Sequence, residues 1–81
     1  MRIVFQVTDV DVRENVRQAL KQIEEDTEVT YPDDNESTKI EVIECATDYI
    51  CDRYERSDNG YLPNYYMIVY DTLKDYYCIV D

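Results

Sequence analysis

The sequence predicts a small α+β domain, with two helices packed on one face of a mostly antiparallel sheet in the order β-α-(β)-α-β-β. Three observations predict this class. The first residues alternate in polarity like a strand, two internal segments carry apolar residues at helical spacing, and the C-terminal segment is rich in aromatic and β-branched residues. Because 81 residues have room for only one core, we expect a single acidic domain over residues 1–81.

The first two elements follow from apolar spacing. In residues 2–8 the side chains of Ile3, Phe5 and Val7 fall on one face, which is the period of a strand. Residues 11–25 have the spacing of an amphipathic helix, with Asp9 and Asp11 as capping candidates before it. Its predicted core positions are Val12, Val16, Ala19, Leu20 and Ile23.

A short edge strand over residues 27–31 and a turn over residues 32–37 lead to a second helix over residues 38–57. This helix is expected to end at Asp58-Asn59-Gly60, where Asn or Gly accepts a left-handed conformation. Its predicted core face consists of Ile40, Ile43, Thr47, Ile50, Cys51 and Tyr54.

The C-terminal segment reads as a hairpin of two strands, residues 65–70 and 76–80, joined by residues 71–75. Alternation places large apolar or aromatic groups on both faces of this hairpin, more than one core can cover. One interpretation is that tyrosines shield a one-sided sheet with their hydroxyls in water. The other is a surface for self-association, since Tyr is enriched at interfaces; that surface would consist of Tyr65, Tyr66, Tyr70, Tyr76 and Tyr77.

The composition argues against the common catalytic and cofactor sites. The chain has no histidine, which excludes an ordinary hydrolytic triad. It has one glycine, which excludes a glycine-rich phosphate loop. Residues 33–44 resemble a calcium loop, but Thr38 stands where the sharp turn needs glycine. Cys45, Cys51 and Cys78 form no zinc pattern and are an odd number, which favours a reducing compartment. We therefore expect a non-enzymatic protein without metal or cofactor.

Net charge restricts the partners. There are 19 Asp and Glu against 8 Lys and Arg, which gives −11, and this charge repels nucleic acid and anionic membranes. No apolar run has the roughly 20 residues of a membrane span, and the first residues do not resemble a signal peptide. The expected partner is a basic protein, and the expected compartment is the cytoplasm.

The charge is concentrated in one part of the chain. Residues 24–58 hold 13 acidic and 3 basic residues, hence a net charge of −10. Five acids of the second helix fall within about 80° of arc at 100° per residue: Glu41, Glu44, Asp48, Asp52 and Glu55. Like charges at these spacings cost about 0.2–0.5 kcal/mol per pair. The stripe is expected beside the core face, with Val42, Cys45 and Tyr49 on the remaining outer arc as a contact surface.

The cost of this stripe suggests that it binds a basic surface, although solubility alone also explains an acidic helix face. The expected partner-binding set adds four neighbours to the five stripe residues: Asp33, Asp34, Glu36 and Tyr49. In size, acidity and lack of catalytic motifs the chain resembles the small proteins that phages and mobile elements use against host nucleases, including anti-CRISPR proteins. That resemblance implies an inhibitor that mimics nucleic acid in the host cytoplasm.

Two alternatives stay open. The first is an antitoxin or immunity protein that masks a basic ribonuclease by the same electrostatics. The second is a non-catalytic assembly module that dimerises through its tyrosines or through the arc of Val42, Cys45 and Tyr49, in which case the acidic residues serve solubility only.

Overall fold

The computed structural model describes residues 9–32, 36–56 and 61–79, and these residues form three helices. They are α1 (Asp9–Asp26), α2 (Ser37–Arg56) and α3 (Tyr65–Asp75). The described residues contain no strand, so the predicted α+β fold is wrong. The expected first strand, residues 2–8, lies outside the described part of the chain.

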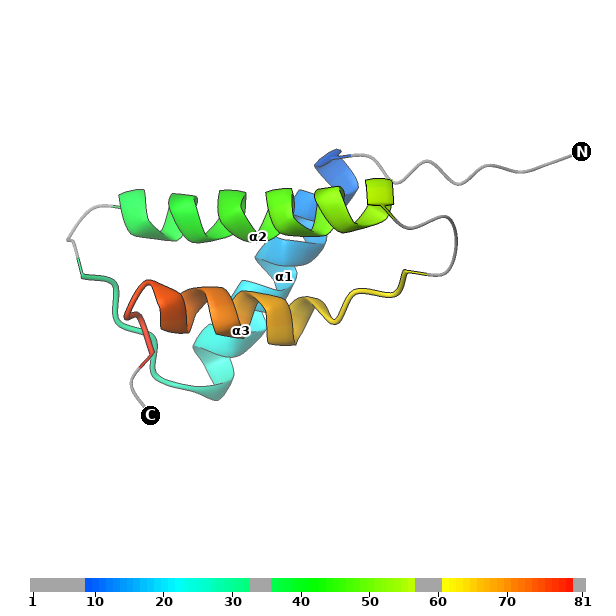
Figure 1. Cartoon of the computed structure of the whole chain (residues 1–81). Helices are drawn as coiled ribbons and strands as arrows, with labels where there is room; N and C mark the ends of the chain where they lie inside the picture. Colours follow the sequence, from blue (N-terminus) through cyan, green and yellow to red (C-terminus); the bar gives the residue numbers. More distant parts are fainter. Residues whose placement is uncertain (1–8, 33–35, 57–60, 80–81) are drawn as a thin grey trace, which may run out of the picture.

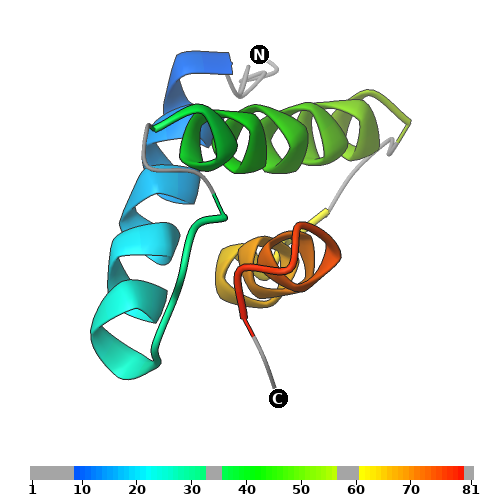
Figure 2. The same ribbon diagram turned by 90° about the vertical axis from the view of Figure 1, so that its left-hand side faces the viewer.

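The three helices do not form a bundle of parallel axes. Helices α2 and α3 run in opposite directions, and α1 crosses behind both of them (Figure 1). Turning the molecule shows α1 along one side, with α2 and α3 both extending away from it (Figure 2). Each pair of helices is in contact, so the core lies where the three helices meet.

Helix α1 confirms the helix predicted for residues 11–25 and begins two residues earlier. Asp9 and Asp11 lie in its first turn, where carboxylates interact favourably with the helix dipole. Its apolar stripe is fully buried, since Val12, Val16, Leu20 and Ile23 are at most 1% exposed. Successive members are three or four residues apart, which places them on one side of the helix.

Helix α2 confirms the second predicted helix, but its buried side differs from the predicted one. Ile40 is 54% exposed, whereas Val42, expected on the outer arc, is fully buried. The reason is that α2 is covered on two sides: Lys39 and Ile43 face α1, and Cys45 and Tyr49 face α3. The covered arc is therefore wider than one stripe and turned toward α3. Its buried residues are Thr38, Val42, Ile43, Ala46, Thr47 and Ile50.

Helix α3 replaces the predicted hairpin. Asn64 caps it, and its side-chain oxygen accepts a hydrogen bond from the Met67 backbone N–H at 3.1 Å. Val69 and Leu73 are fully buried, four residues apart on one helix face. The residues predicted as a turn, 71–75, form the last turns of this helix. Its aromatic and β-branched content favours a strand locally, but packing against α1 and α2 decides the conformation.

The end of α3 is a Schellman motif with tyrosine in the position usually taken by glycine. The Cys78 N–H donates to the Leu73 carbonyl at 2.8 Å, and the Tyr77 N–H donates to the Lys74 carbonyl at 3.0 Å. Tyr77 has φ 61°, in the left-handed region. This turn brings Cys78 and Ile79 back into the core. The predicted second strand of the hairpin is thus a helix cap followed by a buried tail.

The expected edge strand over residues 27–31 is also wrong, because these residues form a connection and not a strand. One backbone hydrogen bond joins it to the C-terminal tail, from the Thr30 N–H to the Cys78 carbonyl at 2.8 Å. Val29 and Tyr31 pack against the core from this connection. Within the described residues these contacts hold the connection against the core, but they do not form a strand ladder.

The position of the core in α2 can be tested with one substitution at two sites. Ile50→Ala is expected to lower the free energy of unfolding by about 2–5 kcal/mol, because Ile50 is fully buried. Ile40→Ala is expected to change it by less than about 0.5 kcal/mol, because Ile40 is largely exposed. Urea unfolding followed by circular dichroism measures both. Equal losses at the two positions would contradict the described orientation of α2.

The left-handed conformation of Tyr77 predicts a substitution that raises the free energy of unfolding. Tyr77→Gly is expected to stabilise the protein by roughly 0.5–1 kcal/mol. A non-glycine residue in the left-handed conformation costs about 1–2 kcal/mol, which glycine avoids. Part of this gain is lost because glycine makes the unfolded chain more flexible. Little packing is lost, since Tyr77 is 84% exposed. Tyr77→Ala is the control and should give no such gain. A destabilised glycine variant would contradict the cap.

Candidate functional site

All five predicted stripe residues lie on the exposed side of α2. We call this set the acidic face: Glu41, Glu44, Asp48, Asp52 and Glu55. At 100° per residue the centre of this face is about 180° from the centre of the buried residues of α2. The expectation that the stripe lies beside the core is therefore wrong, and it faces directly outward. The position of the stripe differs from the predicted one because the buried side of α2 is turned toward α3.

Two of the five carboxylates have cationic partners within the protein. Arg13 of α1 donates to Glu44 at 2.9 Å and also lies 3.3 Å from Asp9, so it links the start of α1 to the middle of α2. Arg56 pairs with Asp52 one turn away at 3.0 Å. Among the described residues, the remaining three members, Glu41, Asp48 and Glu55, make no ion pair.

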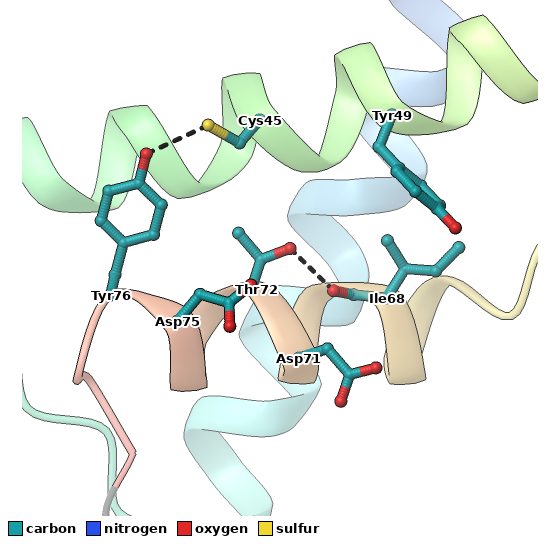
Figure 3. A pocket seen from close by; sticks show the side chains of 7 residues that line it. All are labelled: Cys45, Tyr49, Ile68, Asp71, Thr72, Asp75 and Tyr76. Carbon is teal, nitrogen blue, oxygen red and sulfur yellow. Dashed lines mark hydrogen bonds between the residues drawn. The ribbon is translucent and has the colours of Figure 1, made fainter.

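A groove of about 380 Å³ runs between α2 and α3, next to the acidic face (Figure 3). Cys45 and Tyr49 enter it from α2, while the other lining residues come from α3 and the residue after it. Those residues are Ile68, Asp71, Thr72, Asp75 and Tyr76. The groove thus combines an apolar and aromatic lining with two carboxylates.

Tyr76 closes one end of the groove by reaching across to α2 (Figure 3). Its hydroxyl lies 3.1 Å from the Cys45 sulfur. This contact, together with burial and the nearby charge of Glu41, raises the pKa of Tyr76 to about 12. Tyr76 is therefore neutral at physiological pH and joins the two helices through a polar contact.

Tyr49 lies toward the other end and already carries a cation. The guanidinium carbon of Arg53 is 5.0 Å from the centre of the Tyr49 ring, and its Nη2 donates to the Tyr49 hydroxyl at 3.0 Å. This arrangement is a cation–π contact within the acidic helix. It shows that the geometry of this tyrosine suits a guanidinium group.

Asp71 and Asp75 were not in the predicted site, because residues 71–75 were assigned to a loop. In the structure both are exposed on α3 and line the groove. A sequence signal was present: Asn64 is a typical N-cap residue, and the two aspartates are four residues apart, on one side of a helix that begins there.

The structure separates the predicted tyrosine surface. Tyr65, Tyr66, Tyr70 and Tyr76 are partly buried and pack against the core, and only Tyr77 among the five is exposed. Tyr66 stacks on Tyr70 with 6.5 Å between ring centres and donates to Asp26 of α1 at 3.1 Å. Of the predicted outer arc, Val42 is buried, while Cys45 and Tyr49 are exposed beside the groove.

Three further residues of the predicted partner-binding set precede α2. Asp33 and Asp34 lie outside the described residues, and Glu36 is exposed just before the helix. Within the described ranges no group of three or more His, Cys, Asp or Glu residues could hold a metal ion. No helix there is long and apolar enough to cross a membrane.

The thiols are free, and two of them lie in unreactive surroundings. Cys78 is buried, and burial together with the neighbouring Asp9 carboxylate raises the pKa of Cys51. A raised pKa keeps the thiol protonated, which makes it a poor nucleophile.

No family model, curated protein or solved structure matches this chain. A row of outward carboxylates beside an aromatic groove is suited to charge-assisted hydrogen bonds with Arg and Lys and to cation–π contacts.

Proposed function

We propose that this protein is a non-catalytic acidic inhibitor that binds a basic partner protein and occupies the groove in which that partner binds nucleic acid. A nuclease or CRISPR effector of a host defence system is the kind of partner that fits. The observation that carries the proposal is the acidic face of α2, where Glu41, Asp48 and Glu55 make no ion pair within the described residues.

Outward orientation alone does not require a partner, since helix surfaces are normally charged. What supports binding is that five successive outward positions carry the same sign, whereas solvated helix faces usually mix both signs. The acidic face extends about 21 Å along the helix at 1.5 Å per residue. Its neighbouring carboxylates are about 5–6 Å apart at their Cβ atoms, so they form a regular row of anions.

The groove extends this charged surface. Asp71 and Asp75 continue the negative charge onto α3, and Tyr49 has an aromatic ring that binds a guanidinium group, at present that of Arg53. An interface of this kind combines steering of a cationic partner with a small number of aromatic contacts.

The dimerising alternative has less support than the sequence suggested. One of its two predicted surfaces was a tyrosine-covered sheet face, and the described residues form no sheet. The other was the arc of Val42, Cys45 and Tyr49, of which Val42 is buried in the core. Four of the five tyrosines concerned pack against the protein's own core. A partner of opposite charge is therefore the better interpretation of the exposed surface.

Charge reversal on the acidic face tests the proposal. A basic partner captured on the immobilised protein should be released by excess duplex DNA and by salt, because DNA competes for the same groove. Glu44→Lys, Asp48→Lys and Asp52→Lys together should abolish capture. Arg53→Gln should strengthen capture, because it removes a cation from the surface and frees Tyr49.

The matched control changes the same number of charges elsewhere. Glu14→Lys, Glu25→Lys and Glu28→Lys together alter exposed residues outside the acidic face and should leave most of the capture intact. Equal loss in both triple variants would mean that net charge alone is responsible. A captured partner that duplex DNA does not displace would contradict the proposed mode of binding.

A further inference from the structure

A second hollow, of about 440 Å³, lies between α1 and α2 and has the opposite electrical character. Six residues line it: Arg17, Leu20, Lys21, Glu24, Lys39 and Ile43. Three of them are cations and one is an anion. In a chain with a net charge of −11, half of the lining of this hollow is basic.

The three cations differ in whether they form ion pairs within the protein. Lys39 lies 3.6 Å from Glu24, which also accepts a hydrogen bond from the Tyr31 hydroxyl at 3.0 Å. Arg17 and Lys21 form no ion pair with any described residue. They are exposed on successive turns of α1, four residues apart, so both side chains lie along the same side of the hollow.

The net charge of the hollow favours an anionic ligand. Three cations and one carboxylate leave a net charge of +2. The dianion of a phosphate monoester carries about −1.5 to −2 at neutral pH and has three acceptor oxygens. Arginine binds phosphate through two parallel hydrogen bonds, and lysine adds a point charge.

The remaining lining residues and the volume indicate what the phosphate is attached to. Leu20 and Ile43 are buried residues that form an apolar floor. The volume falls within the roughly 300–1,000 Å³ typical of small-molecule sites, which is more than a phosphate group needs. The acidic face of α2 points the other way, across a helix about 10 Å in diameter, and salt screens charges over about 8 Å.

We propose that this hollow binds a phosphate monoester, with Arg17 and Lys21 holding the phosphate, Lys39 completing the site, and an apolar or aromatic group resting on Leu20 and Ile43. This site is distinct from the acidic face and does not depend on the proposed function. It gives a role to Arg17 and Lys21, which form no ion pair with any described residue.

Titration of the full chain with phenyl phosphate tests this site, by calorimetry at low ionic strength. Saturable binding with one equivalent is expected. Inorganic phosphate lacks the ring and benzoate carries one charge, so both are expected to bind more weakly. Arg17→Gln with Lys21→Gln should reduce the affinity for phenyl phosphate at least tenfold.

Arg56→Gln is the matched control for the single change Lys21→Gln, because each removes one cation and Arg56 lies outside the hollow; it should leave the affinity unchanged. Circular dichroism checks that each variant is helical. If the double change impairs folding, Lys21→Gln alone replaces it in the test, and this single variant is also expected to bind phenyl phosphate more weakly. Absence of saturable binding, equal affinity for benzoate, or equal loss in the Arg56 variant would overturn the proposal.

Discussion

The fold depends on one buried stripe, the apolar side of α1. Val12, Val16, Leu20 and Ile23 supply four of the twelve buried apolar residues in the described part of the chain, and both α2 and α3 pack against α1. Helices of 20 and 11 residues gain most of their stability from such packing, particularly α3, whose local preference is for a strand. By fixing where α2 makes contact, this stripe also fixes which side of α2 remains outside, and that side is the acidic face.

Tyrosines moderate the negative charge where the helices meet. Acidic residues at the end of α1 oppose its dipole, but two of them accept hydrogen bonds: Glu24 from Tyr31 at 3.0 Å, and Asp26 from Tyr66 at 3.1 Å. Burial and these carboxylates raise the pKa of both tyrosines, which keeps the hydroxyls protonated as donors. Carboxylates at the helix junctions are therefore satisfied internally, while much of the acidic face and the groove aspartates remain available at the surface. The same distribution leaves Arg17 and Lys21 exposed at the opposite side of the α1–α2 junction.

Local patterns predicted α1 and α2 to within about two residues, because both have long apolar periodicity. They failed for α3, since residues 65–70 are aromatic and β-branched, a composition that favours a strand, and the contacts that stabilise the helix, such as those of Val69 in the core, are tertiary. The exposure of Ile40 and the burial of Val42 could also not be predicted from apolar spacing, because two neighbouring helices widen the covered side of α2. The acidic face itself was predictable from spacing alone. The groove with Asp71 and Asp75 was not predictable without α3.

The central functional claim is that the placement of charge on α2, and not the net charge, determines binding. Backbone amide chemical shifts during titration with an oligo-arginine peptide at low ionic strength test it most directly. We predict that the shifts concentrate on residues 41–55 and on the α3 side of the groove around Asp71 and Asp75. Shifts spread evenly over all exposed acids, including Glu14 and Glu25 of α1, would contradict it.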